Sequence, residues 1–267
     1  RSKYFLVAIF SALTFYAYQG AKLNTPFLLL FLYFALKPKL REMLKPALCL
    51  ILLILPILLV LPVTSGRLKV FSVFSYTRSA DYVGNLVSQD PVKLQNIYKF
   101  LFHSETYDQI RGISQRFLNH LSPRYLFVEG NWTDRRQTPA VYYGNFHLFE
   151  FVTILIGIYI LAKNNQKLLV SLFTITFGFI TPSALSRDIV TTVRSLPIIA
   201  PMTIISAVGL SKLLDIKFIK FLSALWVLIS VIYFMDLYSR HTAYFFAKDW
   251  LYPYRQAVEM VAKNQSD

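Results

Sequence analysis

The sequence predicts an all-α polytopic membrane protein with about seven transmembrane helices, and three observations support this class. Charged residues make up 16% of the 267 positions and hydrophobic residues 55%, whereas a soluble domain has roughly 25% charged residues. The apolar residues fall in continuous runs and not in the one-faced or alternating patterns of soluble helices and strands. The mean hydropathy of +0.46 also agrees with a chain that lies largely in a bilayer.

Seven apolar runs predict the membrane helices in chain order, at about 4–19, 23–36, 46–63, 149–162, 168–185, 194–211 and 218–236. Several runs are shorter than the ~20 residues that cross ~30 Å of hydrocarbon, so tilted or re-entrant segments are the alternative for these. The chain then divides into helices 1–3 (1–63), a long loop (64–148), helices 4–7 (149–236) and a tail (237–267). Residue 1 is arginine and the tail stops as an amphipathic stretch ends. We therefore expect an internal piece of a longer protein, whose C-terminal region is truncated here.

Basic residues mark one side of the membrane. They concentrate in alternate short connections: Arg1 and Lys3; Lys37, Lys39, Arg41 and Lys45; Lys163 and Lys167; Lys212, Lys217 and Lys220. The positive-inside rule places these connections in the cytoplasm. The long loop and the tail then face the other side, and we expect a multi-pass protein of the plasma membrane with both segments extracytoplasmic.

The long loop carries signals for helices of its own. Asp90–Pro91 resembles an N-cap followed by proline at the first helical position, and Thr106–Gln109 fits a capping box. Apolar residues then recur at helical spacing until Ser122–Pro123. This pattern predicts two amphipathic helices lying on the outer membrane interface; packing against a soluble domain is the alternative for their apolar faces. In the tail, a short helix is predicted near 253–263.

Several classes of site are excluded by composition. Cys49 is the one cysteine and lies in an apolar run, so disulfides and thiolate metal sites are excluded, and the four histidines lack metal-ligand spacing. No nucleophile elbow, phosphate-binding loop or dinucleotide fingerprint is present. We therefore expect no evident cofactor and no nucleic-acid partner. A divalent metal stays open, although the chain has no ligand set for one.

The candidate site residues are charges at the outer ends of the helices. At mid-depth the predicted spans carry hydroxyls (Thr174, Thr176 and Ser206) but no charged residue, which argues against an ion-coupled transporter. The donor-phosphate candidates are Arg135, Arg136, Arg187 and Arg194. Guanidinium groups suit a phosphate carried by a lipid tail, and they stabilise the charge that grows when that phosphate leaves. Interfacial snorkelling is the alternative for each arginine.

A second group of residues comprises candidates for substrate binding: Tyr18, Lys22, Asp134 and Glu150. Glu150 also has an alternative role as a favourable charge at a helix start. Asn131-Trp132-Thr133 forms a glycosylation sequon, which is a weak three-residue signal.

Four stretches together resemble the membrane glycosyltransferases of the C-type superfamily. They are TFYAYQGAKLNTPFLLL (14–30), FLNHLSPRYLFVEGNWTDRRQTPAVYYGNFHLFEF (117–151), TPSALSRDIVTTVRSLPIIAPMTIISAVGL (181–210) and YFFAKDWLYPYRQAVEMV (244–261). More narrowly, they resemble the bacterial family related to dolichyl-phosphate-mannose–protein mannosyltransferases and to the aminoarabinose lipid A transferase. Two departures are visible. Asn131–Arg136 stands where the family often has Asp-Pro-Asn-x-Arg-His, and Thr191 stands where a histidine is common.

The resemblance implies transfer of a sugar from a polyprenyl-phosphate donor to a lipid, glycan or protein acceptor on the extracytoplasmic side. It also implies a carboxylate general base on the family's first outer loop, which would lie upstream of residue 1, so no catalytic residue is named in this chain. The resemblance carries over to Arg135, Arg136 and Arg194 as ligands of the donor phosphate. The expected partners are this donor, the bilayer and an unknown acceptor. The alternatives are a transporter or flippase for a lipid-linked saccharide, and a non-catalytic membrane scaffold.

Overall fold

A computed structural model describes residues 2–18, 20–64, 80–90, 96–250 and 252–264. These residues form helices joined by turns and loops, without a β-strand among them, as the predicted fold class requires. The chain splits into two compact units: unit 1 holds residues 1–118 and 173–189, and unit 2 holds residues 119–172 and 190–267. The predicted long loop (64–148) therefore contributes to both units.

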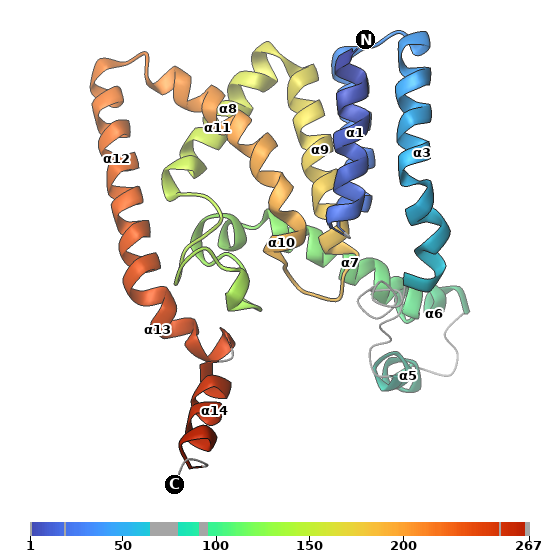
Figure 1. Cartoon of the computed structure of the whole chain (residues 1–267), viewed down its shortest axis with the longest axis vertical. Helices are drawn as coiled ribbons and strands as arrows, with labels where there is room; N and C mark the ends of the chain where they lie inside the picture. Colours follow the sequence, from blue (N-terminus) through green and yellow to red (C-terminus); the bar gives the residue numbers. More distant parts are fainter. Residues whose placement is uncertain (1, 19, 65–79, 91–95, 251, 265–267) are drawn as a thin grey trace. The chain divides into compact units, whose positions relative to one another are not determined.

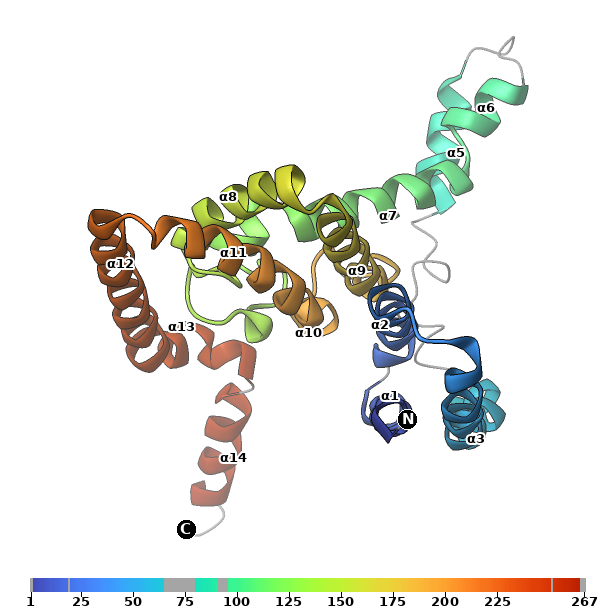
Figure 2. The same ribbon diagram turned by 90° about the horizontal axis from the view of Figure 1, so that it is seen from above.

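Three apolar helices begin unit 1: α1 (Ser2–Ala17), α2 (Ala21–Leu36) and α3 (Leu40–Thr64) (Figure 1). Figure 2 shows them nearly end-on, with α3 beside α1. The Thr14 and Thr25 hydroxyls lie 2.9 Å apart across α1 and α2, and the Tyr16 hydroxyl donates to the Leu53 carbonyl oxygen of α3 at 2.7 Å. These bonds satisfy polar groups that would be costly to leave unpaired in an apolar layer.

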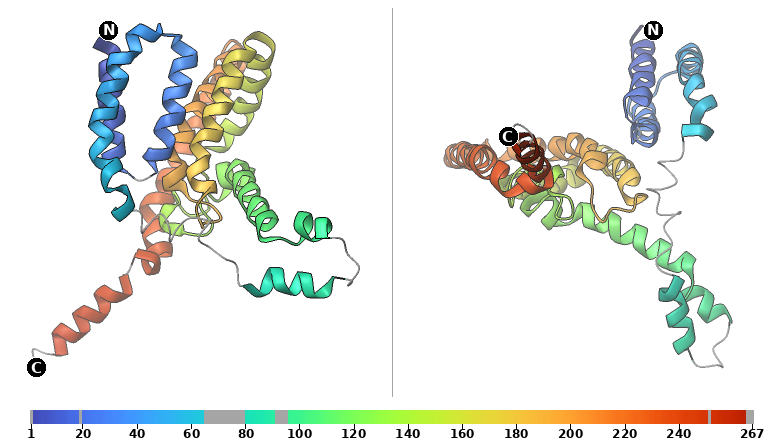
Figure 3. Two further views of the ribbon diagram at one scale, coloured as in Figure 1. Left: turned by 90° about the vertical axis from the view of Figure 1, so that its right-hand side faces the viewer. Right: turned by 60° about the horizontal axis from the view of Figure 1, so that its bottom comes forward.

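The predicted loop helices are present in unit 1 as α6 (Asn96–Phe102) and α7 (Glu105–Leu121), preceded by a further helix, α5 (Ala80–Gln89) (Figure 3). The predicted end at Ser122–Pro123 is confirmed. The predicted capping box at Thr106 is wrong, because α7 already begins at Glu105 and the Ser104 hydroxyl accepts the Tyr107 N–H at 3.2 Å. The predicted cap at Asp90–Pro91 falls partly outside the described residues.

Unit 2 is built on α8 (Leu148–Asn164), α11 (Ile199–Leu213) and α12 (Lys217–Asp236). α8 and α11 cross closely because Gly157 and Gly209 expose their backbones: a Cβ added to Gly157 would lie 2.9 Å from the Ile205 carbonyl carbon. The Thr153 and Ser206 hydroxyls, 2.6 Å apart, bond at the same crossing. Small residues with one interhelical hydrogen bond are typical of helix packing in membranes.

Among the residues that the structure describes, four helical segments are long and apolar enough to cross a membrane: Leu40–Val60, Gln166–Ala184 in α9, Thr192–Leu213 and Lys217–Phe246. Their length and composition indicate a membrane protein. Lys3–Ala17 and Ala21–Phe34 are shorter apolar helices. Helices therefore occupy all seven predicted positions, and the crossing of the membrane by all seven stays a prediction.

The last predicted span, 218–236, matches α12, but the helical path continues beyond it. After α12 the helix continues through η5 (Leu237–Thr242) and α13 (Ala243–Phe246), followed by η6 (Ala247–Trp250) and α14 (Tyr252–Asn264). The predicted tail helix near 253–263 is confirmed by α14.

Candidate functional site

The loop that carries Arg135 and Arg136 is folded around a buried turn, η2 (Arg124–Val128). Tyr125, Leu126 and Phe127 of this turn are buried. Residues 144–146 close over it: the Phe146 N–H donates to the Leu126 carbonyl oxygen at 2.8 Å, and a Cβ on Gly144 would collide with the backbone of Phe127. A glycine at position 144 therefore lets the two segments of the loop lie in direct backbone contact.

The turn before the arginines is organised by the side chain of Asn131. Its Oδ1 accepts from the Thr133 N–H at 3.0 Å, the Thr133 hydroxyl at 2.8 Å and the Asp134 N–H at 2.8 Å. Asparagine favours this local side-chain-to-backbone turn. Asn131 is only 1% exposed, so the folded loop leaves no room for a glycan at the predicted sequon.

Arg135 and Arg136 lie together in a short 3-10 turn, η3 (Arg135–Gln137), but their surroundings differ. The Arg136 guanidinium donates to both carboxylate oxygens of Asp134, at 2.9 and 3.0 Å. Hydrogen bonding from Arg136 is the main reason why the pKa of Asp134 lies below its ordinary value. Arg135 is exposed, and within the described part of the chain its guanidinium makes no hydrogen bond or ion pair. Arg135 is therefore the better placed of the two to receive an anion.

Gln137 joins this turn to α10 (Thr192–Ser195), the short helix that carries Arg194. Its Oε1 accepts from the Thr191 hydroxyl at 3.0 Å and from the Val193 N–H at 3.3 Å. Its Nε2 donates to Asp134 at 3.0 Å. One amide thus links the carboxylate that holds Arg136 to the backbone next to Arg194.

Two buried contacts and one half-buried contact strengthen the same connection. The Tyr125 hydroxyl lies 2.6 Å from the Ser195 hydroxyl, and the Thr191 N–H donates to His120 Nε2 at 3.1 Å. The Thr133 hydroxyl reaches the Val190 carbonyl oxygen at 3.3 Å. Burial raises the pKa of Tyr125, so this phenol stays protonated at physiological pH. Hydrogen bonds therefore connect the loop to the segment that contains the Arg-Ser-Leu-Pro sequence.

An open cleft of about 530 Å³ lies at this turn. Its lining consists of Trp132, Thr133, Asp134, Arg135, Arg136 and, from η6, Asp249. The Arg124 guanidinium lies 4.5 Å from the centre of the Trp132 ring and also donates to Glu129 at 2.7 Å. Asp249 is half-buried, and its Oδ2 has no hydrogen-bond partner in the described structure. The cleft thus combines cations, carboxylates and an aromatic ring.

Glu150 lies at the start of α8, away from this lining. Its carboxylate accepts the His147 N–H at 2.9 Å, which is the contact expected of an acidic residue that caps a helix start. The Tyr143 hydroxyl bonds His147 Nδ1. Burial, followed by the charge of Glu150, raises the pKa of Tyr143 to about 12, so its hydroxyl is the donor. These contacts give Glu150 a structural role at the helix start.

The remaining predicted residues are not among those that line the cleft. Arg194 lies one residue after Val193 but does not line the cleft. Tyr18, Lys22 and Arg187 belong to unit 1. Asp249 was missed as a site residue, although it lies inside the stretch 244–261 that carries part of the family resemblance; an acid following an apolar helix was the available signal. The described residues contain no group of three or more histidines, cysteines or acids that could hold a metal.

Comparisons with protein families, with curated proteins and with solved structures found no match to this chain.

Proposed function

We propose that this chain is the C-terminal portion of an integral membrane glycosyltransferase, which moves a sugar from a polyprenyl-phosphate donor to an extracytoplasmic acceptor. The cleft at Arg135 and Arg136 would hold the phosphate and sugar of the donor. The observation that carries the proposal is the lining itself, in which guanidinium groups, carboxylates and a tryptophan ring share one open space.

Each part of this lining suits one part of a glycosyl phosphate. Arg135 offers planar donors to phosphate oxygens. The Asp249 carboxylate, which lines the cleft, offers a hydrogen-bond acceptor to a sugar hydroxyl. The Trp132 ring presents an apolar surface to the C–H face of a sugar.

The chemistry needs a cation where charge develops. The acceptor hydroxyl oxygen forms a bond to the anomeric carbon while the bond from that carbon to the phosphate oxygen breaks. The acceptor proton passes to a general base, and the polyprenyl phosphate leaves with the bonding electrons. Its charge changes from that of a phosphodiester to that of a phosphomonoester, so a fixed guanidinium stabilises the transition state more than the ground state.

The arrangement of charges within unit 2 supports the sidedness that this proposal requires. The lysine-bearing turn between α8 and α9 and the turn between α11 and α12 lie at one end of unit 2, and the loop with η2 and η3 lies at the other end (Figure 1). If the lysine-rich turns are cytoplasmic, the cleft faces outward.

The test is sugar transfer in membranes that contain the expressed protein, with a radiolabelled polyprenyl-phosphate hexose as donor. We expect the double variant Arg135→Ala with Arg136→Ala to lower transfer by about 100-fold, the effect of losing preorganised charge stabilisation. The exposed Arg255→Ala variant on α14 is the control. Membrane insertion should be equal in both. Unchanged turnover in the double variant refutes the assignment of the donor site to this cleft. Transport of the uncleaved donor across the vesicle membrane favours the transporter.

A further inference from the structure

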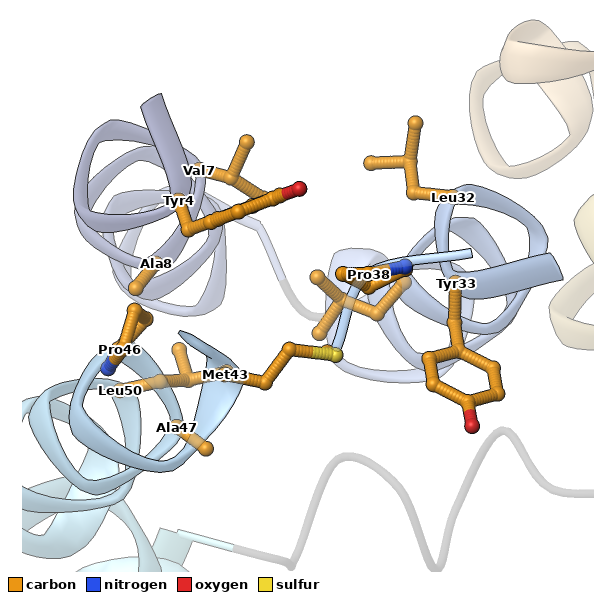
Figure 4. Close-up of a pocket in the computed structure, with 11 residues that line it drawn as sticks. Tyr4, Val7, Ala8, Leu32, Tyr33, Pro38, Met43, Pro46, Ala47 and Leu50 are labelled. Carbon is orange, nitrogen blue, oxygen red and sulfur yellow. The ribbon is translucent and has the colours of Figure 1, made fainter. Parts of the chain in front are cut away.

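A second cavity lies in unit 1, among α1, α2 and α3, and plays no part in the proposed function. It measures about 160 Å³. Figure 4 shows Tyr4 of α1 and Met43 of α3 extending into it, with Pro38 of the α2–α3 connection facing them. Its wall is almost entirely apolar, so a water molecule would find few hydrogen-bond partners there.

The size of the cavity limits what can enter. An engineered apolar cavity of about 150 Å³ stays dry and admits benzene, so a space of this size takes a segment of one hydrocarbon chain. The lining runs along α3 from Met43 to Leu50. At 1.5 Å per residue, the rise from Leu40, where α3 begins, to Leu50 is about 15 Å, which is half of the hydrocarbon thickness. The cavity therefore lies within one leaflet.

Cations surround the same end of these helices. Pro38 lies between Lys37 and Lys39, and Tyr4 follows Lys3; all three lysines are exposed. Residues 37–45 hold four cations (Lys37, Lys39, Arg41, Lys45) and one carboxylate (Glu42), a net charge of +3. Tyr4 and Tyr33, which also line the cavity, are of the type that gathers at headgroup depth.

We infer that this cavity is a binding site for an anionic phospholipid. One acyl chain fills the apolar space, and the phosphate headgroup lies against Lys37 and Lys39. The lysines next to the cavity determine which lipid binds. Their positive charge favours an anionic lipid over a zwitterionic lipid with identical chains.

The test is native mass spectrometry of the purified chain, titrated with phosphatidylglycerol or with phosphatidylcholine of the same acyl chains. The wild-type chain should retain phosphatidylglycerol preferentially. Lys37→Gln with Lys39→Gln should weaken its binding by about 30-fold, or roughly fivefold for each lysine. The same change at Lys163 and Lys167, in another basic turn, should leave binding unaltered.

A second variant addresses the cavity itself. Ala47 is exposed and lines the space, so Ala47→Phe fills it without disturbing a packed contact. Binding should fall by about tenfold, the loss expected when two methylene groups are excluded. Leu48→Phe, on the next residue and outside the lining, is the control, and Val7→Phe is the substitute if Ala47→Phe fails to insert. Equal retention of the two lipids, unchanged binding in both test variants, or preferential retention of polyprenyl phosphate at this site would each overturn the inference.

Discussion

Gln137 offers the sharpest test of whether the Arg135–Arg136 turn and the α10 segment act as one unit. Replacing it with leucine keeps a side chain of similar size and changes no charge. The substitution removes the bonds from Thr191 and Val193 to Oε1 and the bond from Nε2 to Asp134. The two bonds at 3.0 Å each contribute about 1 kcal/mol, and the longer, exposed one to Val193 contributes little.

The expected loss is therefore about 2 kcal/mol of local stability, which corresponds to about a 30-fold larger population of the opened turn. Amide hydrogen exchange measures this population directly. The N–H groups of Thr133, Asp134, Arg136, Gln137 and Thr138 all donate hydrogen bonds within the turn. They should exchange about 30-fold faster in Gln137→Leu.

The control is Gln256→Leu, an exposed position on α14 of the same unit. Equal amide exchange rates over residues 133–138 in the wild type and in Gln137→Leu would show that Gln137 does not hold this turn to α10. Sugar transfer should also fall in Gln137→Leu although both arginines are intact, because the turn no longer holds them in place.

Three further predictions concern stability. Gly209→Leu should destabilise the chain by about 1–3 kcal/mol in detergent melting, because its side chain collides with the Thr153 backbone; an equally large loss in the exposed Ala207→Leu would show that the crossing is not responsible. The pKa of Asp134 is depressed below 3.8, so its contribution to the turn is complete above about pH 4 and is lost as the pH falls through the lower folded value. Opening of the turn, measured by amide exchange over residues 133–138, should then increase as the pH falls in the wild type but not in Asp134→Asn. The same increase in Asp134→Asn would exclude Asp134 as its source. Ser104→Ala should cost about 1 kcal/mol and speed exchange in the first turn of α7, whereas Thr106→Ala should leave this turn unchanged; the opposite ranking would restore the capping box at Thr106.

Hydropathy predicted the positions of the apolar helices well, because a continuous apolar run must be removed from water along its whole length. The prediction of 23–36 corresponds to α2 at Ala21–Leu36. The predicted end of the last span at 236 coincides with the end of α12, but the continuation of the helical path to Phe246 was not predicted, for an identifiable reason. The polar residues after Asp236 indicated that the chain leaves the apolar layer there. In the structure, the Ser239 and Thr242 hydroxyls donate to helix carbonyl oxygens, and Arg240 pairs with Asp236 at 2.9 Å. The helix satisfies these groups itself and continues.

The beginning of α7 was ambiguous in the sequence. Ser104 and Thr106 can both cap a helix, and Thr106 has the glutamine three residues later that completes a capping box. The choice depends on which backbone N–H groups face the hydroxyl, and this follows from the turn after α6. Local spacing does not contain that information.

The candidate site was predictable in its charges and not in its partners. The doublet Arg135–Arg136 was visible as an unusual basic pair beside an apolar run. The local bonds of Asn131 and Asp134 follow from turn chemistry, but the approach of Asp249 and the link from Gln137 to Thr191 depend on residues far apart in the chain. Such pairings arise from packing of the whole unit, so spacing alone does not reveal them.

The balance of charge in the cleft bears on what it could bind. Its lining contains two arginines and two aspartates, which cancel. A site selected only for anion binding would gain from excess positive charge, and a side chain that merely snorkels needs no carboxylate partner. Asp134 instead binds the guanidinium of Arg136, which leaves Arg135 for one anionic group, and Asp249 adds a second carboxylate to the lining. A ligand that presents one phosphate and several hydroxyls satisfies both requirements. A glycosyl phosphate is such a ligand, and a simple inorganic anion is not.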